Sequence, residues 1–137
     1  MRYFFYGTLM DGAVLAAVLG RTPPRPFRPA VLDGYLRVFR KGRSYPVLVP
    51  SDGECVAGVL VEGLGEGDAR RLGAFEGSDY TLREMPVRLS RGREVGALVF
   101  MPRPGVPASS VPWLPEEWHR RCRRRYLERI GRTHKPS

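Results

Sequence analysis

The sequence is short of cysteine and histidine, the residues that cross-link small domains or bind zinc. It has two of each in 137 residues. Cys55 and Cys122 lie far apart along the chain, and only two histidines accompany them. This scarcity excludes a disulfide framework and effectively excludes a structural zinc site, so the fold must depend on its hydrophobic core.

Long apolar runs are also absent. No segment approaches the ~18 apolar residues of a membrane span, and Met1 and Arg2 lead into a strand-like run without the apolar region of a secretory signal. The composition, 42% hydrophobic and 27% charged, is typical of a folded globular chain. We expect a cytoplasmic protein without a membrane partner. We expect it to form one domain over 1–137, with a core over about 2–102 and a proline-rich connection and basic helix over 103–137.

Lysine is scarce as well, although the chain is strongly basic. The net charge is +9, and only Lys41 and Lys135 of the 23 basic residues are lysines. A basic surface attracts phosphate whatever the nucleotide sequence. An arginine excess beside 16 glycines and 13 prolines also fits a coding bias, however. Charge alone therefore does not decide for or against a nucleic-acid partner.

The amino-terminal segment predicts a strand, a glycine turn and a helix. Residues 2–6 are apolar and aromatic, which suits a strand buried on both faces. Asp11 is placed to cap a helix over 13–19, and Gly20 is placed to end it. The prolines of 21–29 remove backbone donors and restrict their neighbours, so we expect a loop or an extended arm there.

A β-rich region follows. Turn residues separate strand candidates at 31–40, 45–49, 55–62, 80–89 and 94–101. The triplet "SDG" is interpreted as a turn between the second and third candidates, and the short connections favour antiparallel pairing. Between the third and fourth candidates, apolar residues at helical spacing predict a short helix over 66–75, with Gly77 at its end.

Proline recurs before a final helical segment. Pro115 and the two glutamates after it predict the first turn of a helix that Gly131 ends. An apolar residue at every fourth position forms a stripe that should dock on the body of the protein: Trp118, Cys122, Tyr126 and Ile130. The arginines on the other faces are expected to lie in solvent, partly paired with glutamates. His119 and His134 have no carboxylate or cysteine partner in the sequence that would suggest a catalytic dyad.

Glu76 gives the strongest chemical signal in the chain. It falls in the last turn of the predicted helix, where the helix dipole favours a cation over a carboxylate by ~0.3 to 1 kcal/mol. If apolar neighbours such as Leu72 and Phe75 also desolvate the carboxylate, both effects raise its pKa towards neutrality, as a general base requires. The alternative is a solvated side chain or one paired with Arg83, and the local pattern taken alone favours this alternative.

The glycine turn after the first strand could supply the complementary part of a site. The backbone N–H groups of Gly7, Thr8 and Leu9 would form a concave receptor for a carboxylate or a developing oxyanion. An ordinary tight turn, with Thr8 bonded locally to the backbone, explains the same residues at least as well.

Four motifs together resemble the gamma-glutamylcyclotransferase-like family. They are Tyr6-Gly7-Thr8-Leu9, Tyr45-Pro46-Val47-Leu48-Val49-Pro50, Val56-Ala57-Gly58, and Phe75-Glu76-Gly77 followed by Tyr80 and Arg83. The similarity runs from about Tyr3 to Met101, with the motifs in the family's order and spacing. Val47 is a departure, because many relatives carry a small residue after the proline of the second motif.

The resemblance implies an α+β fold, a small mixed β-barrel with flanking α-helices, and a cavity at the first turn. It also implies a reaction without metal or cofactor, in which the α-amino group of a gamma-glutamyl amine or peptide attacks its own side-chain carbonyl and releases 5-oxoproline. Glu76 matches the catalytic glutamate and would act as general acid and base. The substrate-binding residues implied are Tyr6, Gly7, Thr8, Leu9, Tyr80 and Arg83.

Two alternatives stand beside this enzyme. The same fold and cavity could bind a small carboxylate-bearing ligand without catalysis. The segment "HRRCRRRYLERIGR" could instead contact nucleic-acid phosphates, although a solvated helix face is the simpler interpretation and a nucleic-acid partner is not expected. The sequence leaves open which gamma-glutamyl compound is used and which oligomer forms.

Overall fold

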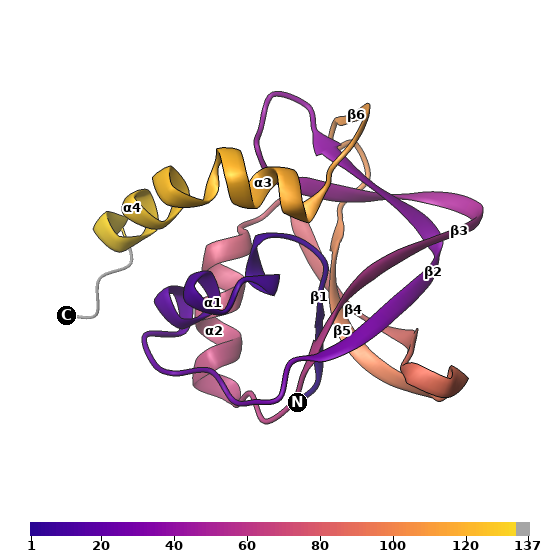
Figure 1. Cartoon of the computed structure of the whole chain (residues 1–137), viewed down its shortest axis with the longest axis horizontal. Helices are drawn as coiled ribbons and strands as arrows, with labels where there is room; N and C mark the ends of the chain where they lie inside the picture. Colours follow the sequence, from indigo (N-terminus) through magenta and orange to yellow (C-terminus); the bar gives the residue numbers. More distant parts are fainter. Residues whose placement is uncertain (134–137) are drawn as a thin grey trace.

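Strands and helices occupy opposite sides of the molecule (Figure 1). The computed structural model describes residues 1–133. Its strands are β1 Tyr3–Phe5, β2 Arg28–Arg40, β3 Pro46–Val61, β4 Tyr80–Arg88, β5 Glu94–Pro102 and β6 Ala108–Pro112. Its α-helices are α1 Gly12–Leu19, α2 Glu66–Glu76, α3 Pro115–Arg121 and α4 Arg123–Thr133.

Five of the strands close into a mixed barrel. The sheet order is β3-β1-β5-β4-β2-β6, and a further pairing of β3 with β2 closes the ring. β1 runs parallel to β5 and antiparallel to β3, whereas β2, β3, β4 and β5 otherwise pair antiparallel. The expected α+β fold, a mixed barrel with flanking helices, is confirmed.

The first strand is buried on both faces, as its sequence predicts. Successive side chains of a strand point to opposite faces. Phe4 and Tyr6 belong to the apolar cluster inside the barrel. Tyr3 and Phe5 belong to the cluster that the strand shares with the helices. β1 therefore joins the two hydrophobic cores, and the turn that follows it lies where they meet.

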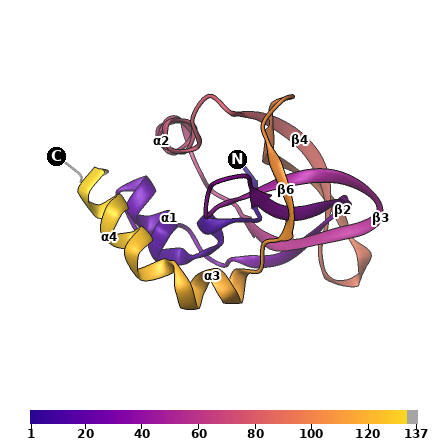
Figure 2. The same ribbon diagram turned by 90° about the horizontal axis from the view of Figure 1, so that it is seen from above.

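Helices α1 and α2 begin and end within one residue of the predicted bounds. The Asp11 carboxylate accepts a hydrogen bond from the Ala13 N–H at 2.9 Å, which caps α1. Gly20 ends α1 with φ 69°, and Gly77 ends α2 with φ 79°; both values lie in the left-handed region that favours glycine. α1 packs against both α2 and α4 (Figure 2). α1, α2 and α4 thus pack together beside the barrel, and α3 leads into α4.

The predicted boundary inside β3 is wrong. Segments 45–49 and 55–62 belong to one strand, and both pair with β2 instead of with each other. The register shifts between Asp33 and Tyr35, so that residues 51–54 bulge out opposite Gly34. The "SDG" triplet lies in this bulge. Because β2 and β3 stay paired on both sides of the bulge, the chain bends there but does not reverse.

Both proline-rich segments contain more strand than the sequence predicts. β2 begins at Arg28, inside the expected arm over 21–29. β6 lies between Pro102 and Pro115 and, among the described strands, pairs with β2 alone. Proline is tolerated in such an edge strand because one side of the strand needs no hydrogen-bond partner.

The carboxyl-terminal helix is divided at Cys122. The backbone there has φ −120° and separates α3 from α4, although the Tyr126 N–H still bonds to the Cys122 carbonyl at 3.0 Å. The predicted stripe is confirmed, because Trp118, Tyr126 and Ile130 are buried and Cys122 packs against the same core. Gly131 lies inside α4, so its predicted role as a helix end is wrong. His134 lies outside the described residues.

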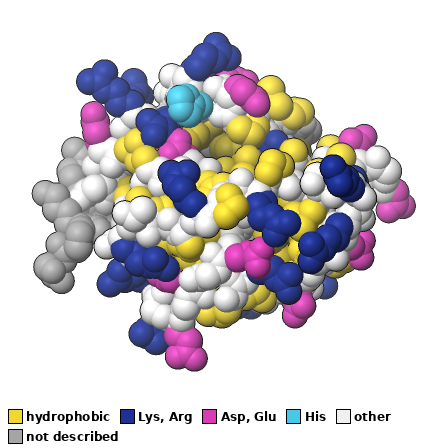
Figure 3. Space-filling view, turned by 60° about the horizontal axis from the view of Figure 1, so that its bottom comes forward, with side chains coloured by type: hydrophobic (Ala, Val, Ile, Leu, Met, Phe, Trp, Pro, Cys, Tyr) yellow, Lys and Arg dark blue, Asp and Glu magenta, His cyan; other side chains and the backbone are white. Residues whose placement is uncertain are grey.

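Acidic side chains are interspersed among the arginines of the surface (Figure 3). On the carboxyl-terminal helices, Arg121 pairs with Glu117 and Arg124 with Glu128. Such exposed i,i+4 pairs contribute little to stability, but they match the expected solvated helix face. No helix within the described residues is long and apolar enough to cross a membrane.

Two glycine substitutions test how closely β1 and β3 approach. A Cβ on Gly58 would lie 2.4 Å from the Phe5 carbonyl oxygen and 2.6 Å from the Phe4 ring, whereas a Cβ on Gly73 in α2 would meet nothing within 4 Å. We expect Gly58→Ala to lower the free energy of unfolding by about 1 to 3 kcal/mol through overpacking. Gly73→Ala should raise it by about 0.5 to 1 kcal/mol because alanine is the better helix former. Urea unfolding measures both, and a Gly58→Ala protein as stable as the wild type would contradict this packing.

Candidate active site

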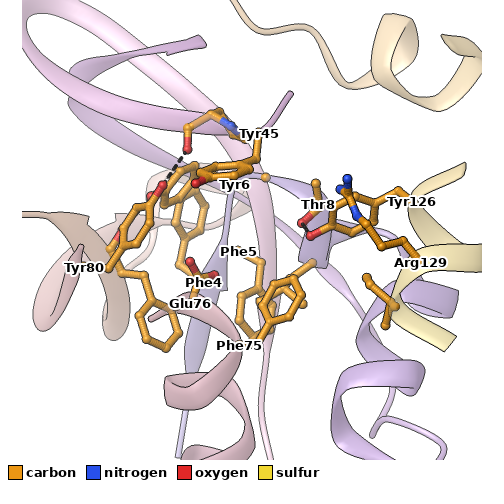
Figure 4. A pocket seen from close by; sticks show the side chains of 15 residues that line it. Phe4, Phe5, Tyr6, Thr8, Tyr45, Phe75, Glu76, Tyr80, Tyr126 and Arg129 are labelled. Carbon is orange, nitrogen blue, oxygen red and sulfur yellow. Dashed lines mark hydrogen bonds between the residues drawn. The ribbon is translucent and has the colours of Figure 1, made fainter. Parts of the chain in front are cut away.

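A cavity opens between the barrel and the helices, next to the turn after β1 (Figure 4). Its volume is about 380 Å³, the size of a pocket for a small molecule. β1 and its turn, β3, α2, β4, β5 and α4 all contribute side chains to it. Its walls are mostly aromatic: Phe4, Phe5, Tyr6, Tyr45, Phe75, Tyr80, Phe100 and Tyr126.

Gly7 lets two segments of the barrel come together beside this cavity. A Cβ on Gly7 would lie 2.9 Å from the Pro46 ring, so any larger residue would push β3 away from the turn. A single turn of 3₁₀ helix, Thr8–Met10, follows directly, with the Met10 N–H bonded to the Gly7 carbonyl. The first N–H groups of a helix have no acceptor within it. The turn therefore brings unpaired backbone donors to a wall of the cavity.

The Arg37 side chain also holds this turn in place, a role that the sequence did not predict. Its guanidinium donates to the Tyr6 carbonyl at 2.9 Å and to the Ala57 carbonyl at 2.8 Å. The same group lies 5.5 Å from the centre of the Trp113 ring. No local pattern distinguishes Arg37 from the other arginines, because its partners come from distant parts of the chain.

Glu76 is the last residue of α2, and its side chain extends into the cavity (Figure 4). It has no hydrogen-bond or ion-pair partner in the described part of the chain. Burial raises the pKa of its carboxyl group from 4.5 to about 7, because the surrounding protein disfavours the charged form. The alternative pairing with Arg83 does not form. Near neutral pH this carboxylate can both accept and return a proton.

Three tyrosines with hydrogen-bonded hydroxyl groups line the same cavity as the carboxylate. Tyr6 donates to the Phe100 carbonyl at 2.6 Å, and Tyr80 donates to the Pro46 carbonyl at 3.2 Å. The Tyr126 hydroxyl lies 3.3 Å from the Thr8 hydroxyl. Burial and the nearby Glu76 raise the pKa of all three, to about 12 for Tyr126. These phenols therefore stay protonated at neutral pH, and Glu76 is the group in the cavity that titrates there.

α4 forms a wall of the cavity that the sequence did not predict. It contributes Tyr126, Arg129 and Ile130. The Arg129 guanidinium lies 5.3 Å from the centre of the Tyr126 ring. The four-residue stripe did identify Tyr126 and Ile130 as docking residues, but it could not say that their docking partner is a cavity.

The structure brings together all but one of the residues assigned to the site. The cavity is lined by Tyr6, Gly7, Thr8, Leu9, Glu76 and Tyr80. Arg83 is exposed on β4 and does not line the cavity, so we leave it out of the site. Among residues 1–133 there is no group of three or more His, Cys, Asp or Glu side chains that could hold a metal ion.

Curated relatives match most of this chain. Protein AIG2 C of Arabidopsis thaliana is 33% identical over 118 residues, which span 84% of this chain and 70% of the relative. AIG2-like protein A of the same plant is 31% identical over 127 residues, which span 91% of this chain and 76% of the relative. These alignments reach from the barrel into the carboxyl-terminal helices.

Solved structures share the architecture. A solution structure of an Arabidopsis thaliana protein superposes with a TM-score of 0.68 at 28% identity, over 96% of this chain and 80% of that one. A structure named gamma-glutamyl cyclotransferase gives a TM-score of 0.62 over 100% of this chain and 89% of that one. At 16% identity, the second likeness shows the fold alone.

A family match covers the barrel, the turn and Glu76. The family described as "Gamma-glutamyl cyclotransferase, AIG2-like" matches residues 3–120. This range includes the four motifs on which the resemblance was based. The chain therefore belongs to the AIG2-like gamma-glutamyl cyclotransferase family.

Proposed function

We propose that this protein is a gamma-glutamylcyclotransferase that converts a gamma-glutamyl amine or a small gamma-glutamyl peptide to 5-oxoproline and a free amine. The observation that carries the proposal is the unpaired Glu76 carboxyl group, whose pKa is raised to about 7 inside an aromatic cavity. A stable fold does not need a carboxylate there. A proton-transfer reaction near neutral pH does.

In the proposed complex, the gamma-glutamyl group lies between Glu76 and the turn after β1. The α-ammonium group of the substrate faces Glu76, the acidic side chain of the cavity lining. The backbone N–H groups at the start of the 3₁₀ turn donate to the α-carboxylate or to the oxyanion that forms on the γ-carbonyl. The aromatic walls exclude water from the curled substrate.

The reaction then needs only proton transfers and one exchange of C–N bonds. Glu76 takes a proton from the α-ammonium group, and the freed nitrogen attacks the γ-carbonyl carbon. The tetrahedral intermediate collapses as the bond from that carbon to the leaving nitrogen breaks. The α-nitrogen gives up two protons in all, and the leaving nitrogen takes up two to depart as an ammonium group. Glu76 carries the protons and ends in its starting state.

The cavity contributes in two further ways. The nucleophile and the carbonyl belong to one molecule, so holding the substrate curled brings them together without loss of translational entropy. Hydrogen bonds aimed at a developing oxyanion lower the barrier by ~3 kcal/mol for each donor in other enzymes. Gly7 and Arg37 keep the turn in place for this role.

Replacing the proposed base should abolish the activity. We expect Glu76→Gln to lower kcat by about 10²- to 10⁴-fold, because glutamine keeps the shape but accepts no proton. The matched control is Glu66→Gln, at the other end of α2 and outside the cavity. The assay measures 5-oxoproline released from a panel of gamma-glutamyl amines and dipeptides. If the wild-type protein releases no 5-oxoproline from any substrate of the panel, the proposed catalysis is wrong and a non-catalytic binding role is favoured.

The same substitution should stabilise the fold above neutral pH. Burial holds the folded-state pKa of Glu76 near 7, above its ordinary value of 4.5. The favourable contribution of the protonated group is therefore complete below about pH 4.5 and is lost as the pH rises through 7. Glutamine keeps the neutral state at every pH.

Urea unfolding of the wild type and Glu76→Gln at pH 4.5 and pH 8 measures this difference. We expect the two proteins to have similar free energies of unfolding at the lower pH. At pH 8 the variant should be more stable, by at most on the order of 3 kcal/mol. A variant that is less stable than the wild type at pH 8 would show that the carboxylate is stabilised by a partner and is no base.

A further inference from the structure

We propose that α4 completes the substrate site and that Arg129 selects gamma-glutamyl substrates whose leaving amine carries a carboxylate. This inference rests on the proposed function and adds to it the chemical class of the leaving group. α4 begins at Arg123, beyond the residues 3–120 that match the family. The wall that it forms therefore lies outside the range that the family match covers.

α4 is held in place beside the turn after β1. Arg123 forms an ion pair with Asp11, which caps α1 directly after the 3₁₀ turn. The Tyr126 hydroxyl is within 3.3 Å of the Thr8 hydroxyl. The apolar stripe of the helix is buried in the core that α1 and α2 share. These contacts hold the helix against the turn and the core, so it presents Tyr126 and Arg129 to the cavity in a fixed position.

The lining of the cavity carries one charge of each sign among the described residues. Glu76 is its acidic side chain, and Arg129 is its basic one. Arg129 is exposed, so it lies at the mouth of the cavity, whereas Glu76 is half-buried and its carboxyl group is largely shielded from solvent by the surrounding protein. Between them the Phe75 and Tyr126 rings meet edge to face, with their centres 6.4 Å apart (Figure 4). The cavity therefore runs from the half-buried Glu76 carboxyl group, along aromatic surface, to the exposed Arg129 guanidinium.

A substrate of matching polarity fits this arrangement. With its α-ammonium group at Glu76, a gamma-glutamyl compound extends its leaving amine towards the mouth. An apolar body on that amine would lie along the Phe75 and Tyr126 rings. A carboxylate at its end would reach Arg129, whose guanidinium carries five N–H donors and can bind an anion alongside the contacts that it already makes.

The same charge disfavours other leaving groups. A leaving amine that ends in a second ammonium group would face the Arg129 guanidinium, and like charges repel. A neutral carboxamide would lose the charge-assisted hydrogen bonds but keep the aromatic contacts. The geometry thus favours gamma-glutamyl conjugates of apolar amino acids over conjugates of diamines.

Binding measured by calorimetry without turnover tests this selection directly. The probes are gamma-glutamyl-phenylalanine and its terminal carboxamide, in a Glu76→Gln background that cannot turn them over. We expect the acid to bind about fivefold more tightly than the amide, the effect of one partly exposed charge-assisted hydrogen bond. Adding Arg129→Gln should remove this preference, and adding Arg129→Lys should retain part of it. Arg125→Gln is the matched control, an exposed arginine of α4 that does not line the cavity.

Two outcomes would overturn the inference. One is equal affinity for the acid and the amide, or no binding of either. The other is a preference that Arg129→Gln leaves unchanged or that Arg125→Gln removes equally. Release of 5-oxoproline by the Glu76-containing protein is measured separately. Selective, Arg129-dependent binding without that release would reject the proposed catalysis while leaving Arg129 as the anion-recognition residue. Circular dichroism of each variant shows whether it is folded.

Discussion

The proposed chemistry depends on one unfavourable placement, a half-buried carboxyl group at the end of α2 that has no partner within the described residues. Burial raises the pKa of Glu76 to about 7, and no cation or backbone donor in the described chain offsets this. The negative end of the helix dipole faces the same side chain. Stability would favour almost any neutral residue here. The position therefore points to chemistry, because a proton acceptor with a pKa near neutrality has to be destabilised as an anion.

The rest of the fold holds a turn opposite this acid. β1 is buried on both faces, so its end is fixed by the barrel and by the helices at once. Gly7 allows the turn to touch Pro46, and Arg37 anchors the Tyr6 carbonyl that precedes it. α4 closes the remaining side through Tyr126 and Arg129. Segments that lie far apart in the sequence thus line one small cavity, and packing against the core holds each of them in place.

Local signals predicted the parts of this protein, whereas long-range pairing decided how they meet. The cap at Asp11, the stop at Gly20 and the position of Glu76 in its helix follow from a few neighbouring residues. The bulge in β3 depends on its continuous pairing with β2, which no turn signal shows. Arg37 binds Tyr6 across 31 residues and Tyr126 meets Thr8 across 118, so neither role was predictable from spacing. Arg83 was assigned by its motif alone, and on β4 its side chain is exposed to solvent.

The pKa of Glu76 itself is the most direct test of this account. NMR titration of its side-chain carboxyl carbon, in protein labelled with ¹³C at glutamate, reports that value without reference to any substrate. The account predicts a midpoint of about 7. A midpoint at or below the ordinary value of 4.5 would mean that water or an unrecognised partner stabilises the anion, and would contradict the role of Glu76 as a neutral-pH base.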